Sequence, residues 1–128
     1  MNTDFGTNVS VAVEAGHMLL SGRELIKEIA DKTVLGEYGM DFRYVSWIGK
    51  DGTLEGKNNV GSHVFGTWSV DEAEHTLSLL WDGGWDDTTT QAYIGGGQIR
   101  YYDIGTGNWR TTFTNISERK QHPLVVPN

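Results

Sequence analysis

The chain of 128 residues contains no cysteine, only two prolines and no long apolar run. Without cysteine it can form no disulfide, thiolate metal site or cysteine nucleophile, and a cytoplasmic location is expected. The apolar runs are too short to cross a bilayer. The first residues carry neither the positive charge nor the apolar stretch of a signal peptide. We therefore expect a cytoplasmic protein without a membrane-spanning segment.

Basic residues are also scarce, with 10 Lys and Arg against 17 Asp and Glu and a net charge of −7. Nucleic acids and anionic lipid surfaces both attract clustered basic side chains. The only concentrated basic stretch is Arg119-Lys120, so we expect neither nucleic acid nor membrane as a partner. None of the four histidines has a metal-binding spacing, and the sequence predicts no metal and no cofactor.

Glycine is abundant, with 17 residues, and most of these glycines lie between segments rich in β-branched and aromatic residues. This pattern predicts about eight short strands joined by tight turns. Such a meander is typical of an antiparallel sandwich or an up-and-down barrel, and we favour a single barrel domain over residues 1–128. The predicted strands cover residues 33–38, 41–48, 53–57, 63–70, 75–81, 88–94, 98–104 and 108–114.

One helix is predicted after residue 20. Ser21 and Glu24 form a capping box, and Leu25, Ile26 and Ile29 follow at helical spacing. The helix should end near residues 31–32, and it could close one end of the barrel.

The two ends of the chain have weaker patterns. Residues 1–19 show little periodicity, but Val9, Val11 and Val13 alternate and predict an edge strand. Residues 118–128 contain both prolines, and we expect a frayed tail there.

Four short motifs occur in a recognisable order. The segments LSGREL (20–25), DGTLEG (51–56), GTWSV (66–70) and LSLLW (77–81) match the pattern LSGxEL, DGTxxG, GTWxV and LxW. In this order the chain resembles a group of small, largely uncharacterised bacterial lipocalin-like (calycin) β-barrel proteins. The resemblance implies the barrel and transfers no function.

Aromatic and arginine side chains on the predicted strands are the candidate ligand contacts. Aromatic walls with a few polar groups are typical of small-molecule pockets, although cross-strand aromatic pairs also build cores. An inward arginine would favour a carboxylate or phosphate on the ligand. We therefore predict that a small hydrophobic or aromatic molecule, with or without a carboxylate, binds inside the barrel. The predicted ligand-binding residues are Tyr44, Trp47, Phe65, Trp68, Trp81, Tyr93, Arg100 and Trp109.

Two other functions remain open from the sequence. A cofactor-free lyase, isomerase or cyclase could use the same cavity, with His63, Arg43 and Tyr101 as acid–base candidates. A protein–protein module could use an exposed strand edge and a tryptophan-rich face. The sequence leaves open the ligand, the strand face that points inward and whether the protein is a monomer or a homodimer.

Overall fold

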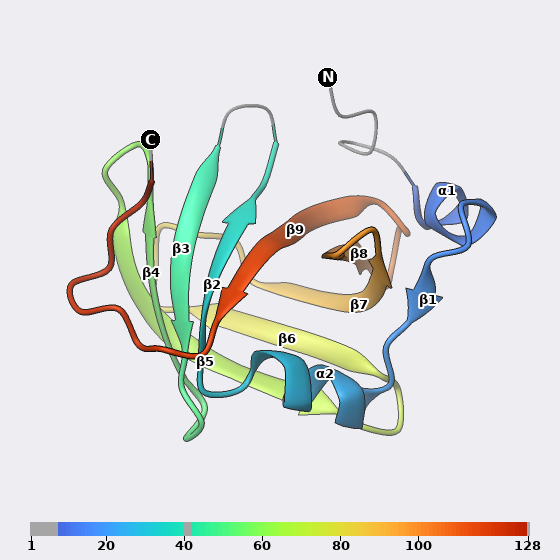
Figure 1. The fold of residues 1–128 in the computed structure, drawn as a ribbon, viewed down its shortest axis with the longest axis horizontal. Helices are drawn as coiled ribbons and strands as arrows, with labels where there is room; N and C mark the ends of the chain where they lie inside the picture. The colour runs from blue at the N-terminus through green and yellow to red at the C-terminus, as the bar shows by residue number, and fades with distance from the viewer. Residues whose placement is uncertain (1–7, 40–41, 128) are drawn as a thin grey trace.

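A computed structural model describes residues 8–39 and 42–127, and its strands form one closed antiparallel barrel (Figure 1). The helices and strands are α1 Val9–Glu14, β1 Met18–Leu19, α2 Gly22–Ile29, β2 Lys32–Glu37, β3 Arg43–Ile48, β4 Thr53–Asn58, β5 His63–Asp71, β6 Thr76–Trp81, β7 Thr88–Gly95, β8 Gln98–Asp103 and β9 Trp109–Ser117.

The barrel has the simplest antiparallel topology. Strands β2 to β9 each pair with the next in chain order, and β9 also pairs with β2 to close the ring of eight. The short β1 is an additional strand that pairs with β7. The predicted up-and-down barrel is therefore confirmed, and the sandwich alternative is wrong. The predicted strand limits agree closely with the structure, except that residue 41 lies outside the described residues.

Helix α2 closes one end of the barrel, near the start of β2 and the end of β5 (Figure 1). Its N-terminus has the predicted capping box, because Glu24 N donates to Ser21 Oγ and Ser21 N donates to the Glu24 carboxylate. Leu25 and Ile29 are fully buried in the main core, which fills this end of the barrel. The helix ends at Ile29, slightly earlier than predicted.

The predicted N-terminal edge strand is wrong, because Val9–Glu14 forms helix α1 instead. Asn8 caps this helix by accepting a hydrogen bond from Ser10 N. Ala12 is the buried residue of α1, and it packs against Tyr102 and Trp109 on the outside of the barrel. A helical turn places Ala12 on those rings, and this tertiary contact outweighs the β propensity of the alternating valines.

The C-terminal segment is docked against the barrel, so the expectation of a frayed tail is wrong. Leu124 is only 2% exposed. Thr33 Oγ1 donates to the Arg119 carbonyl at 2.6 Å and accepts from Gln121 N at 3.2 Å. Burial of the apolar Leu124 side chain stabilises the docking of this segment against the barrel. The two prolines do not prevent this contact.

Within the part of the chain that the structure describes, no helix is long and apolar enough to span a membrane.

Candidate functional site

The barrel encloses a cavity of about 400 Å³ at the end opposite α2. Its floor is apolar, and its wall and rim carry most of the aromatic and polar groups. The cavity is lined by Tyr38, Tyr44, Ser46, Ile48, Leu54, Asn58, Val60, Ser62, Leu79, Trp81, Gly84, Trp85, Asp86, Thr88, Arg110, Thr111 and Phe113. A pocket of this size and composition can hold one small molecule.

Two glycines make room for the aromatic wall. Gly36 on β2 faces Tyr44 on β3, and a Cβ atom at Gly36 would overlap the Tyr44 ring. A Cβ atom at Gly56 on β4 would lie 2.7 Å from Cζ3 of Trp85 and 3.1 Å from Ser46 Oγ. Both glycines therefore permit a large ring to lie directly on the strand backbone.

Trp85 comes from the loop between β6 and β7, and its ring covers part of the cavity mouth. Gly83 and Gly84 precede it with φ values of 150° and 80°. Glycine tolerates this backbone, which turns the loop so that Trp85 reaches the barrel. The indole packs edge-on against Trp81, with ring centroids 4.6 Å apart, and against Tyr44 at 6.0 Å.

Two buried polar atoms in this wall have no hydrogen-bond partner within the protein. They are Trp85 Nε1 and Ser46 Oγ, and their lack of a partner holds for residues 8–39 and 42–127, which the structure describes. Ser46 is only 3% exposed and points inward from β3 beneath the Trp85 ring. Most buried polar groups in proteins are partnered, and an unpartnered one costs about 1–3 kcal/mol. This wall therefore has unused hydrogen-bonding capacity.

The other polar groups of the wall form two short chains of hydrogen bonds. Thr111 Oγ1 donates to the Glu37 carbonyl at 2.8 Å, so Tyr44 must donate in its 2.5 Å contact with Thr111 Oγ1. Asn58 Oδ1 accepts from two backbone amides, and Asn58 Nδ2 donates to the Tyr38 hydroxyl at 2.9 Å. Among the described residues, the hydroxyl hydrogen of Tyr38 has no acceptor.

A β-bulge places the basic group of the cavity. Tyr101 pairs with Thr111 while Tyr102 pairs with Trp109, so Arg110 is an extra residue in β9. Such a bulge redirects side chains, and here Arg110 lines the mouth. Its guanidinium lies 3.9 Å from the Asp86 carboxylate, whose side chain is 94% exposed.

Burial changes the pKa of two tyrosines that point into the barrel, Tyr44 and Tyr101. It raises the pKa of Tyr44 well above the ordinary value. It also raises the pKa of Tyr101, which is fully buried against Phe113 and whose hydroxyl has no partner. Both side chains are therefore neutral phenols at physiological pH.

The structure places three of the predicted ligand-binding residues inside the barrel. Tyr44 and Trp81 line the cavity. Trp68 points inward nearer the closed end, where its indole Nε1 donates to the Gly49 carbonyl at 2.7 Å. Trp47 and Phe65 lie on the outer face, and Lys120 covers the Trp47 ring.

The other three predicted ligand-binding residues lie on the outer face beside α1. Tyr93 packs on Tyr102, and Arg100 donates to the Gly95 carbonyl and to Gln98. Trp109 lies on the far side of the Arg110 bulge and donates to Thr112 Oγ1. These side chains complete a small outer cluster rather than the cavity wall.

The three acid–base candidates do not meet in the structure. Tyr101 lies inside the core, whereas Arg43 and His63 lie on the outer face of their strands. His63 Nε2 is 2.8 Å from the Glu55 carboxylate, and its ring packs on Phe65. These three residues therefore do not line one common site.

Several cavity residues share no motif that marks them in the sequence. They are Tyr38, Ser46, Asn58, Thr111 and Phe113, whereas Trp85 and Arg110 belong to the aromatic and arginine candidates without a predicted position in the cavity. The alternation of β3 groups Ser46 with Tyr44, so choosing the inward face correctly would have found it. The loop position of Trp85 and the bulge at Arg110 give no comparable signal.

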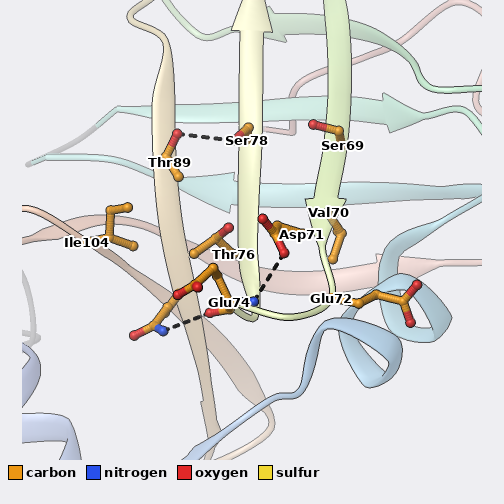
Figure 2. Close-up of a pocket in the computed structure, with 10 residues that line it drawn as sticks. Ser69, Val70, Asp71, Glu72, Glu74, Thr76, Ser78, Thr89 and Ile104 are labelled. Carbon is orange, nitrogen blue, oxygen red and sulfur yellow. Dashed lines mark hydrogen bonds between the residues drawn. The ribbon is translucent and has the colours of Figure 1, made fainter.

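A second, shallow groove lies outside the barrel across β5, β6 and β7 (Figure 2). Its polar groups bond with one another: Ser78 contacts Thr89 at 3.1 Å, Gln91 donates to the Glu74 carbonyl and Glu74 N donates to Asp71. The cavity inside the barrel is the stronger candidate site, because its wall is rich in aromatic side chains and contains the unpartnered Trp85 Nε1 and Ser46 Oγ.

Among the described residues, no group of three or more His, Asp or Glu side chains could hold a metal ion. No protein-family model, curated protein or solved structure matches the chain.

Proposed function

We propose that this protein binds a small, largely aromatic molecule non-covalently in the open end of its barrel. The observation that carries the proposal is the pair of unpartnered atoms, Ser46 Oγ and Trp85 Nε1, in the aromatic-rich wall of a cavity of about 400 Å³. A ligand that displaces the indole and supplies partners for these atoms would remove their desolvation cost.

Binding without chemistry is favoured by the types of residue in the wall. Among the described residues that line the cavity there is no histidine, and the one carboxylate, Asp86, is almost fully exposed. Efficient general acid–base groups have pKa values near the working pH. Burial shifts the pKa of Tyr44 away from that range. The wall is therefore suited to holding a molecule rather than to moving its protons.

The proposal can be tested by filling the cavity. Leu79 lines the cavity, whereas the next residue on β6, Leu80, points outward and is 51% exposed. We expect Leu79→Trp to weaken the binding of a neutral aromatic probe, 2-naphthol, by tenfold or more as measured by calorimetry. Leu80→Trp adds the same indole outside the barrel and should leave binding unchanged.

The affinity expected for the natural-sequence protein follows from the size of the probe. At roughly 0.5 kcal/mol for each of about eleven non-hydrogen atoms, 2-naphthol should bind with a Kd on the order of 100 μM. The proposal fails if calorimetry shows no binding at millimolar probe, or if the two tryptophan variants bind equally well.

A further inference from the structure

The polar groups of the cavity are mostly hydrogen-bond donors. Trp85 Nε1 can only donate, and the Tyr38 hydroxyl, which accepts from Asn58, can still donate its own hydrogen. Ser46 can donate or accept. By contrast, the hydroxyl hydrogen of Tyr44 already donates to Thr111 Oγ1. This surplus of donors fits a ligand that presents acceptor oxygens.

Arg110 adds a positive charge to the same wall. It is the only basic residue among the described lining residues, and its side chain is 36% exposed. Its partner Asp86 is held loosely, because the 3.9 Å separation is long for a hydrogen bond and the carboxylate is in water. Asp103 also faces this charge, but its carboxylate accepts from the backbone amides of Gly105 and Thr106.

A bidentate carboxylate is the group that best matches a guanidinium with free donors. Resting on the proposed function, we propose that the cavity takes an aromatic carboxylate. Its ring lies among the aromatic side chains of the wall, and its carboxylate replaces Asp86 as the partner of Arg110. Asp86 then acts as a competitor for the guanidinium, and removing its charge should favour the ligand.

Three probes with one ring system separate charge from shape: 2-naphthoate, 2-naphthol and 2-naphthylmethylammonium. We expect calorimetry at neutral pH to show that 2-naphthoate binds tightest and the ammonium probe weakest. Arg110→Gln should weaken 2-naphthoate by roughly tenfold and leave 2-naphthol unchanged. Asp86→Asn should strengthen 2-naphthoate by about threefold.

Arg23→Gln is the matched control, because it removes the same charge from an exposed ion pair with Glu72 at the closed end of the barrel. It should leave all three affinities unchanged. The inference is overturned if the ammonium probe binds as tightly as 2-naphthoate, or if the Arg110 and Arg23 variants behave alike. In both cases binding of 2-naphthol keeps the proposed function intact. If none of the three probes binds, the proposed function itself has failed.

Discussion

Two tryptophans allow the same substitution to be made at a satisfied and at an unsatisfied indole. Trp68 and Trp85 are both half-buried and both contact the main core. The Nε1 atom of Trp68 donates to the Gly49 carbonyl at 2.7 Å, whereas Trp85 Nε1 has no partner among the described residues. Replacing each with phenylalanine removes the N–H group and retains an aromatic ring.

The hydrogen bonding of the two indoles determines the size and sign of the difference in the free energy of unfolding between the two variants. Trp68→Phe loses a hydrogen bond of about 1 kcal/mol and leaves the Gly49 carbonyl without that donor. Trp85→Phe removes an unpartnered donor whose burial costs about 1–3 kcal/mol. The loss of apolar contact from the smaller ring is common to both variants. We therefore expect Trp85→Phe to be more stable than Trp68→Phe by about 2–4 kcal/mol.

Urea unfolding followed by circular dichroism measures this difference in the free energy of unfolding. The two variants are comparable, because each keeps four of the original five tryptophans. The binding effect should have the opposite order, with Trp85→Phe weakening 2-naphthoate and Trp68→Phe leaving its affinity nearly unchanged. Equal free energies of unfolding for the two variants would show that Trp85 Nε1 carries no cost, and the argument from unpartnered atoms would be refuted.

Three further predictions concern other parts of the fold. Gly56→Ala places a methyl group 2.7 Å from the Trp85 ring, so the indole should be expelled and tryptophan emission should shift to longer wavelength; an unchanged spectrum would contradict this packing. Because burial raises the pKa of Tyr44 and Tyr101, the native state keeps protons that the unfolded state loses above a pH of about 10. The free energy of unfolding should therefore be unaffected by these groups below that pH and fall above it, by up to about 1.4 kcal/mol per pH unit for each tyrosine, with a shallower fall in Tyr44→Phe. Leu124→Ala should lower the free energy of unfolding by about 2–3 kcal/mol in urea titrations, whereas a loss below about 0.5 kcal/mol would contradict docking of the tail.

Much of the barrel was predictable because its local signals agree with one another. The turn at residues 49–52 has its own backbone hydrogen bonds, and the capping box at Ser21 is formed as predicted. Local agreement of this kind specifies where strands and helices begin and end. The two ends of the chain were mispredicted because their conformation depends on distant partners, as Ala12 and Leu124 show.

The cavity was less predictable because alternation divides a strand into two faces without saying which is inside. In β3 the inward face is set by Gly36 and Gly56, whose missing side chains leave space for the rings of Tyr44 and Trp85. In the sequence these glycines are recognised only as residues that weaken a strand. The bulge at Arg110 is harder still, since it reverses the alternation within β9 and sends Trp109 outside while the arginine reaches the mouth. The residues that would recognise a ligand are thus set by departures from regular strand geometry, which local sequence patterns do not encode.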